Sequence, residues 1–115
     1  MKRVLAFDFG ASSGRAILAQ YSEGALIYRE VHRFENRPRE TDGHFRWDFA
    51  DLMENVYKGI EKAGESDSTG FDTWGVDFGL LDEDGRLLED PVHYRDGRTA
   101  GMVEQAEKIM PQGGL

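Results

Sequence analysis

The sequence has no cysteine among its 115 residues. Disulfide bonds, thiolate metal sites and cysteine nucleophiles are therefore excluded. Long apolar runs are missing too, since no stretch approaches the roughly 20 residues needed to span a bilayer. The apolar run after Lys2 and Arg3 is also too short for the core of a signal peptide. These absences predict a cytoplasmic protein with no membrane contact.

Basic residues are few relative to acidic ones. There are 14 lysines and arginines against 22 aspartates and glutamates, which gives a net charge of -8. Binding to nucleic acid depends on cationic side chains that neutralise phosphates, so this balance argues against a nucleic-acid partner. An acidic protein can still bind ATP if a metal ion and backbone dipoles neutralise the phosphates locally. The apolar share of 39% and charged share of 31% are typical of one globular domain.

The most informative segment is Asp8-Phe9-Gly10-Ala11-Ser12-Ser13-Gly14-Arg15, which lies between apolar runs at 4–7 and 16–21. The glycines allow a tight turn, and the small residues leave backbone N–H groups and two hydroxyls open to an anion. Asp8 ends the first apolar run and could hold a hydrated Mg²⁺ beside phosphates. The segment thus predicts a hairpin that binds a metal-nucleotide.

An ordinary β-turn with an exposed aspartate explains the same residues, because Gly, Ser and Asp are the usual turn residues. The segment is not a P-loop, which ends in Gly-Lys-Ser/Thr, nor a dinucleotide fingerprint, in which a helix follows the strand. Its arrangement resembles the phosphate hairpin of the actin and sugar-kinase class of ATP-binding domains.

The remaining pattern predicts a mixed α/β fold. A third strand at 25–34 completes an antiparallel meander, 36–43 forms a loop, and 45–47 is extended. A helix follows over 49–63, with Asp48 as N-cap and Gly64 as C-terminal stop. Its expected buried stripe is Phe49, Leu52, Val56, Ile60 and Ala63.

The second half predicts a buried strand from Phe71 that ends near Asp77. A hairpin at 80–88 follows, with Asp84-Gly85 as its turn pair. After a loop at 89–98, Thr99 is expected to cap a last helix over 100–109, with Val103 and Ala106 facing inward.

A second polar cluster lies within 72–82. Gly75 would let a hydroxylated ligand approach the backbone, and Asp72, Thr73 and Asp77 offer partners for sugar hydroxyls. Trp74 or Phe78 would form an apolar wall. Taken alone, these aromatic residues are also explained as core, with Asp77 simply ending a strand.

Three segments, 8–15, 72–82 and 94–99, resemble in order and spacing the start of the rhamnulokinases, a group within the carbohydrate kinase family. The resemblance extends over nearly the whole chain. It implies a ribonuclease H-like or actin-like half-domain, with ATP as co-substrate, Mg²⁺ as cofactor and L-rhamnulose or a similar ketose as sugar. A kinase for another sugar of the family remains an alternative.

The resemblance also implies roles for residues at the matching positions. The ATP phosphates would be lined by Ala11, Ser12, Ser13, Gly14 and Arg15. Asp8 would lie near the metal. Gly75 would touch the sugar, with Asp77 and Thr73 beside it, and the 94–99 segment would form the rim of the sugar cleft. No chemistry is assigned to His32, His44 or His93.

Enzymes of this family are several times longer and have two domains. Residues 1–115 are therefore expected to form the N-terminal part of the first domain, with the catalytic aspartate base beyond residue 115. We expect the chain alone to be inactive. A different class of function is an interaction module that self-associates through unpaired sheet edges. Another actin-like ATPase is disfavoured by the sugar-site pattern.

Overall fold

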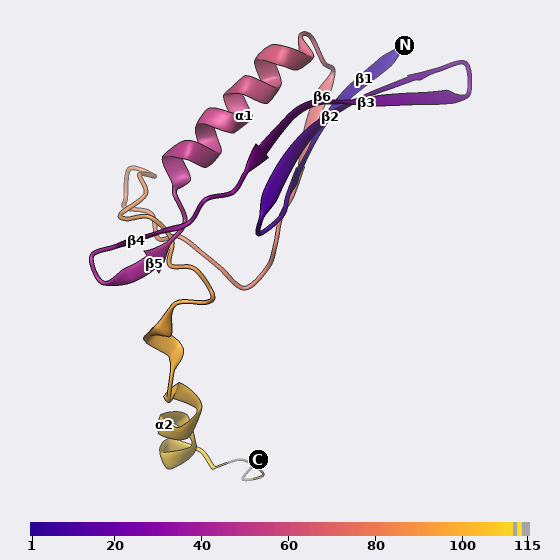
Figure 1. Ribbon diagram of the computed structural model, residues 1–115. Coiled ribbons are helices and arrows are strands. Elements are labelled where there is room, and N and C mark those ends of the chain that lie inside the picture. Colours follow the sequence, from indigo (N-terminus) through magenta and orange to yellow (C-terminus); the bar gives the residue numbers. More distant parts are fainter. Residues whose placement is uncertain (112, 114–115) are drawn as a thin grey trace.

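A four-stranded sheet forms the centre of the computed structural model, which describes residues 1–111 and 113 (Figure 1). Its strands are β1 (Lys2–Phe9), β2 (Ser13–Ser22), β3 (Ala25–Glu35) and β6 (Ser68–Asp72). The order is β3-β2-β1-β6, with the first three strands antiparallel and β6 parallel to β1. The predicted meander is therefore confirmed.

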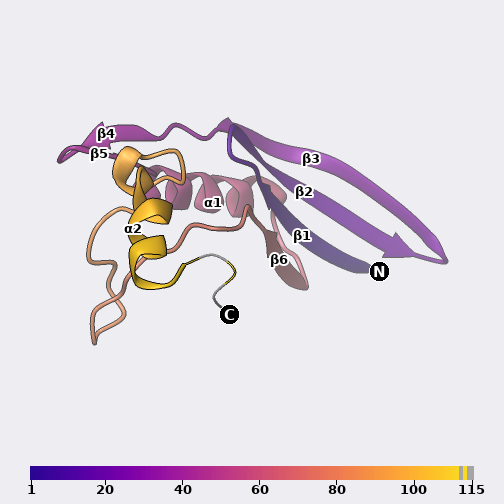
Figure 2. The ribbon, with the colours of Figure 1, turned by 90° about the horizontal axis from the view of Figure 1, so that it is seen from below.

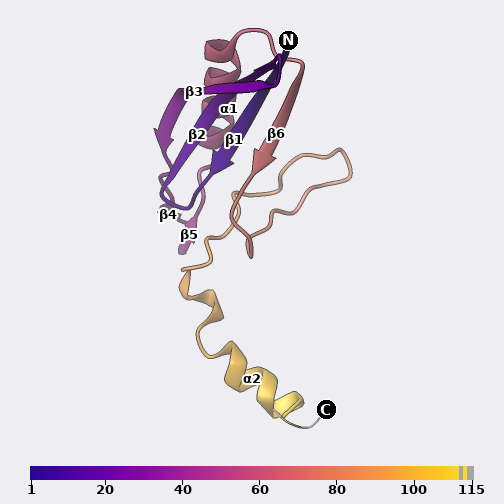
Figure 3. The same ribbon diagram turned by 90° about the vertical axis from the view of Figure 1, so that its right-hand side faces the viewer.

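Helix α1 (Phe49–Ala63) packs on one face of the sheet (Figure 3). Because side chains alternate along a strand, every second residue of β1 and β2 points toward this helix. The shared core consists of Leu5, Phe7, Ala16, Leu18, Val56 and Ala63. Because β6 pairs parallel to β1, the carboxyl ends of these two strands lie side by side at one end of the sheet.

The helix has the predicted ends. The Asp48 side chain accepts a hydrogen bond from the N–H of Asp51, and Gly64 has a φ of 73° after the last turn. The predicted buried stripe is wrong in part, since Phe49 and Ile60 are 40% and 43% exposed. Gly59 is buried instead, because its missing side chain lets the helix approach the ring of Phe7 closely.

A small hairpin occupies part of the predicted loop at 36–43. Strands β4 (Arg39–Thr41) and β5 (His44–Arg46) pair around Asp42 and Gly43, which have φ angles of 53° and 77°. Two consecutive positive φ values define the turn that suits a two-residue hairpin. Figure 2 shows this hairpin at the end of the molecule opposite the turn between β2 and β3.

The fourth strand of the main sheet lies earlier than predicted. It covers Ser68–Asp72, whereas the apolar residues indicated a strand from Phe71 to near Asp77. The pairing with β1 sets this position, because Asp72 lies opposite Asp8. Beyond Asp72 the chain leaves the sheet, and Val76 is 85% exposed with a φ of 69°. Asp77 therefore lies in a loop and does not end a strand.

The predicted hairpin at 80–88 is reduced to a turn with one bridge, between Leu81 and Leu87. The N–H of Asp82 donates to the carbonyl of Arg86, which encloses a three-residue loop ending at Gly85 with a φ of 78°. A positive φ at this position is typical of three-residue hairpin loops.

The C-terminal helix is shorter than predicted. A 3₁₀ turn, η1 (Gly97–Thr99), precedes α2 (Met102–Ile109), so Thr99 does not cap the helix. Gly101 with a φ of 77° is the N-cap instead. Helix α2 projects away from the sheet (Figure 1) and has no buried residue, so the inward orientation expected for Val103 and Ala106 is wrong. No helix in the described ranges is long and apolar enough to cross a membrane.

Candidate nucleotide and sugar site

The turn between β1 and β2 presents free hydrogen-bond donors. It is closed by a hydrogen bond of 2.8 Å from the N–H of Gly10 to the carbonyl of Ser13. Within residues 1–111 and 113, the N–H groups of Ala11 and Ser12 donate to no protein acceptor, and neither do the hydroxyls of Ser12 and Ser13. Adjacent unpaired N–H groups in a turn form a concavity that suits an anion.

Gly14 has a packing role in addition to its predicted place beside the phosphates. Its α-carbon lies against the aromatic ring of Phe34, and a methyl group there would overlap the ring. Phe34 is itself 8% exposed and packs edge-on against Phe9. The glycine therefore lets β2 and β3 meet closely just behind the turn.

Asp8 and Arg15 form an ion pair at the mouth of the turn. They are cross-strand partners in β1 and β2, and a guanidinium nitrogen of Arg15 lies 2.7 Å from a carboxylate oxygen of Asp8. The hydrogen bond and charge of Asp8 raise the pKa of Arg15. About two-fifths of each side chain is exposed, so both groups remain reachable from solvent.

A metal ion at this edge would meet few protein ligands. The described part of the chain holds no group of three or more His, Asp or Glu side chains placed to bind a metal. Asp8 lies opposite Asp72 in the parallel pairing, so one or two carboxylates are available. This donor set fits Mg²⁺, which commonly binds one or two carboxylates and completes its shell with water and phosphate oxygens.

A cavity of about 370 Å³ lies where the carboxyl ends of β1 and β6 meet α1. Its walls come from the end of β1, from α1, from the end of β6 and from the loop that follows. The lining residues are Phe9, Trp47, Phe49, Leu52, Met53, Val56, Phe71, Thr73, Trp74, Asp77, Phe78, Gly79 and Pro91. Crevices at the carboxyl ends of parallel strands are the usual ligand sites of open α/β sheets.

Two of the three predicted sugar residues line this cavity. Thr73 and Asp77 contribute to its wall, whereas Gly75 does not. Gly75 lies on the open side of the loop, where an added methyl group would meet no atom within 4 Å. The structure thus brings Thr73 and Asp77 together at one cavity and leaves the backbone at Gly75 accessible.

Asp77 holds two indole rings. One of its carboxylate oxygens accepts hydrogen bonds from Nε1 of Trp47 at 2.6 Å and from Nε1 of Trp74 at 3.0 Å. The ring centroids of the two tryptophans are 4.3 Å apart, and Trp47 is only 1% exposed. Asp77 therefore fixes the aromatic wall of the cavity as well as facing it.

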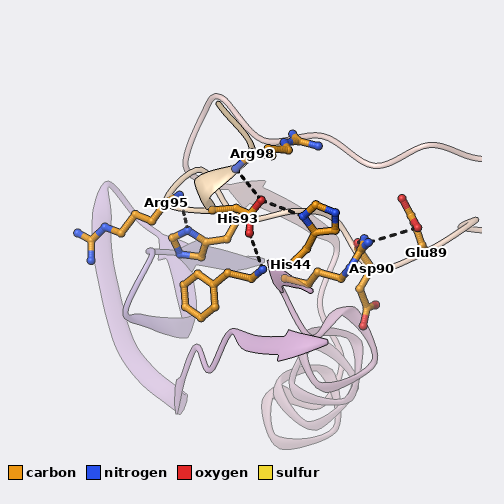
Figure 4. A network of polar contacts seen from close by, with 9 residues as sticks. His44, Glu89, Asp90, His93, Arg95 and Arg98 are labelled. Carbon is orange, nitrogen blue, oxygen red and sulfur yellow. Dashed lines mark hydrogen bonds and ion pairs between the residues drawn. The ribbon is translucent and has the colours of Figure 1, made fainter. Parts of the chain in front are cut away.

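His93 belongs to the same aromatic cluster. Its ring stacks on Trp47 with 4.1 Å between centroids, and burial lowers its pKa. Nδ1 accepts the backbone N–H of Arg95 at 2.9 Å, so the neutral ring carries its proton on Nε2 (Figure 4). The sequence assigned His93 no role, because a single histidine without another at metal-ligand spacing carries no signal of this packing.

Asp96 anchors the 94–99 segment to β5. Its carboxylate accepts the N–H of Phe45 at 2.7 Å, the Nδ1–H of His44 at 3.0 Å and the N–H of Arg98 at 3.1 Å (Figure 4). These hydrogen bonds, that of Phe45 first, lower the pKa of Asp96 to about 2. The segment is thereby held in a fixed position near the aromatic cluster.

Asn36 is a residue of the turn region that the sequence did not indicate. It is 7% exposed, its side-chain amide donates to the carbonyl of Gly10 at 3.0 Å, and its N–H donates to the carbonyl of Ser12 at 2.9 Å. A single polar residue at the start of a polar stretch gives no sign of such contacts.

Known proteins resemble this chain in sequence over nearly its whole length. No family model matches the chain. The rhamnulokinase of Lactiplantibacillus plantarum is 46% identical over 116 residues, covering 97% of this chain and 24% of the relative. The rhamnulokinase of Klebsiella pneumoniae strain 342 is 45% identical over 114 residues, which cover 94% of this chain and 23% of the relative.

Solved structures show the same fold at low identity. A ligand-bound xylulose kinase from Lactobacillus acidophilus matches with a TM-score of 0.72 and 15% identity, covering 96% of this chain and 23% of that one. Glycerol kinase of Plasmodium falciparum, solved with ADP, matches with a TM-score of 0.57 and 17% identity. The match covers 94% of this chain and 23% of that one.

The fold is that of the sugar kinases of the actin-like ATPase class. In sequence the chain is similar to the rhamnulokinases over nearly its whole length. It spans about a quarter of the length of the curated relatives it matches.

Proposed function

We propose that residues 1–115 are the N-terminal part of the first domain of a carbohydrate kinase that transfers the γ-phosphate of ATP to the 1-hydroxyl of L-rhamnulose. The 46% identity to a rhamnulokinase over 97% of the chain carries this proposal. The location of both the turn and the cavity at the carboxyl ends of β1 and β6 supports it. A kinase for a related sugar is the nearest alternative. We also propose a cytoplasmic location for this activity.

The turn would bind the ATP phosphates. The free N–H groups of Ala11 and Ser12, together with the hydroxyls of Ser12 and Ser13, supply donors, and Gly14 keeps the backbone close. Arg15 adds a positive charge at the mouth. Phosphoryl transfer depends mainly on positioning and charge stabilisation, so such donors are what the protein must provide.

Mg²⁺ would be held by Asp8, directly or through water. When bound, it neutralises charge on the phosphate oxygens. Arg15 already contacts the carboxylate of Asp8. When a metal-nucleotide binds, the Arg15 guanidinium therefore has to leave Asp8 and contact a phosphate instead.

The sugar would occupy the cavity. Its volume of about 370 Å³ falls within the range of small-molecule sites. Thr73 and the free oxygen of Asp77 offer hydrogen-bond partners for hydroxyls, and the backbone at Gly75 is open to close approach. The 94–99 segment would form the rim.

No residue of this chain is assigned as the catalytic base, which we expect from the remaining three quarters of a full-length enzyme. A coupled ADP-release assay with Mg²⁺, ATP and L-rhamnulose tests this, with Arg15→Ala and Asp8→Ala alongside. We expect no turnover from the 115-residue chain. Turnover that both variants abolish would mean that the chain supplies its own base.

A second candidate is a self-associating module. All five residues of β6 are exposed, and its outer edge is unpaired in the described part of the sheet. Such an edge is a template for pairing with another strand. Light scattering over a concentration series would detect dimers, and a monomer at every concentration would count against this candidate.

A further inference from the structure

We propose that Asn36 is a positioning residue that orients the phosphate-binding turn. This inference rests on the proposed nucleotide site and adds a residue from outside the turn to it. Asn36 follows β3 directly, in the segment that passes the turn between β1 and β2 (Figure 3). It is 7% exposed and contacts the turn at two points.

Both contacts are made to carbonyl oxygens. The side-chain amide of Asn36 donates to the carbonyl of Gly10 at 3.0 Å, and its backbone N–H donates to the carbonyl of Ser12 at 2.9 Å. Asn36 therefore fixes two of the carbonyl oxygens of the turn toward itself. Carbonyl oxygens that faced a phosphate would repel it.

The planarity of the peptide bond transmits this effect to the donors. The carbonyl of one residue and the N–H of the next share a plane and point in opposite directions in a trans peptide. A carbonyl of Gly10 fixed toward Asn36 thus directs the N–H of Ala11 away from Asn36. The carbonyl of Ser12 fixes the N–H of Ser13 in the same way.

The side-chain contact depends on the residue being an asparagine. Aspartate has nearly the same shape but no N–H donor, so its carboxylate would repel the carbonyl of Gly10. Alanine removes the donor without adding charge. The backbone contact to Ser12 survives in both variants, which should leave β3 in place.

Asn55 offers a matched control. It is also 7% exposed, and its side-chain amide also donates to a backbone carbonyl, that of Asp51 at 2.9 Å. The side-chain hydrogen bonds of Asn55 are made to Asp51 within α1 and to His32, and none is made to the turn. Asn55→Asp therefore reproduces the burial, the charge and the lost hydrogen bond at a place that does not orient the N–H groups.

The test compares the 115-residue chain with Asn36→Asp, Asn36→Ala and Asn55→Asp. Affinities for Mg²⁺-ATP and for Mg²⁺-tripolyphosphate would be measured by calorimetry, with thermal unfolding as the measure of structure. We expect Asn36→Asp to bind both ligands on the order of tenfold more weakly, the factor typical of losing a well-aligned hydrogen bond to a charged group. Asn36→Ala should weaken both ligands by a few fold, and Asn55→Asp should lower the melting temperature without this loss.

Three results would overturn the inference. Unchanged affinity in a folded Asn36→Ala variant would leave only charge repulsion to explain Asn36→Asp. An equal loss of affinity in Asn55→Asp would reduce Asn36 to a general structural residue. Absence of binding by the unsubstituted chain would refute the proposed nucleotide site for this chain, and the role of Asn36 with it.

Discussion

Arg15 donates a hydrogen bond of 2.7 Å to the carboxylate of Asp8, its cross-strand partner, at the mouth of the turn between β1 and β2. Each side chain thus neutralises the other. A metal-nucleotide would break this ion pair and give each side chain a new partner, the cation for Asp8 and a phosphate for Arg15. Metal and phosphate should therefore bind cooperatively, because either one alone leaves a charge of the pair without its partner.

Asp8→Asn tests this coupling. The substitution frees Arg15 and removes a negative charge near the phosphates, so metal-free ATP should bind a few fold more tightly than to the unsubstituted chain. The effect of Mg²⁺ on affinity should largely disappear. Titrations of ATP with Mg²⁺ and with EDTA would measure both. Glu54→Gln is the control, since it breaks an exposed ion pair with Lys58 on α1. A variant that still needs Mg²⁺ as the unsubstituted chain does would contradict the coupling.

Gly14→Ala should destabilise the fold. The added methyl group would overlap the ring of Phe34, and overpacking of this kind costs about 1–3 kcal/mol. Urea unfolding followed by circular dichroism would give the change in the free energy of unfolding. Gly70→Ala is the matched control, because an added methyl group there meets no atom within 4 Å. Equal stability of the two variants would mean that Phe34 does not constrain Gly14.

Asp77→Ala should lower stability because it leaves the N–H groups of Trp47 and Trp74 without their acceptor. A buried donor without a partner costs about 1–3 kcal/mol. Asp77→Asn retains one acceptor oxygen and should cost less. The tryptophan fluorescence spectrum would report the environment of both rings. Asp84→Ala, on an exposed turn, is expected to change neither stability nor spectrum, and a similar loss in that variant would argue against a special role for Asp77.

Asp96 should make stability depend on acidic pH. Its pKa is lowered to about 2 in the folded chain, against about 3.9 for an aspartate in an unfolded chain. The unfolded state therefore binds the proton more readily, so the contribution of Asp96 is complete above pH 4 and is lost as pH falls toward 2. Asp96→Asn should flatten the fall in melting temperature between about pH 4 and pH 2. An unchanged profile would show that Asp96 does not stabilise the fold through its charge.

The elements with strong local signals could be predicted from the sequence. Asp48 and Gly64 mark the ends of α1, and alternating apolar residues between tight turns give the meander. Alternating apolar residues also led to the wrong position for β6, because Trp74, Val76 and Phe78 have the spacing of a strand but lie after it. Trp74 packs on Trp47, a partner far away in the sequence, and pairing with β1 decides which residues form the strand.

The candidate site could be predicted where its residues are adjacent in the sequence. The turn at 8–15 is such a segment, and its residues lie together as expected. The contributions of Asn36 and His93 depend on contacts between distant parts of the chain, which no local pattern encodes. The exposed apolar residues of α2 show the same limit, since periodicity predicts an apolar face without indicating what that face contacts.

An NMR titration of the ¹⁵N-labelled 115-residue chain with Mg²⁺-ATP tests directly whether the turn between β1 and β2 binds phosphate. We expect the largest shifts at the amide groups of Ala11, Ser12 and Ser13, and we expect Arg15→Ala to weaken the response without changing the spectrum elsewhere. Shifts confined to other parts of the chain, or none at millimolar nucleotide, would contradict a phosphate site in this turn.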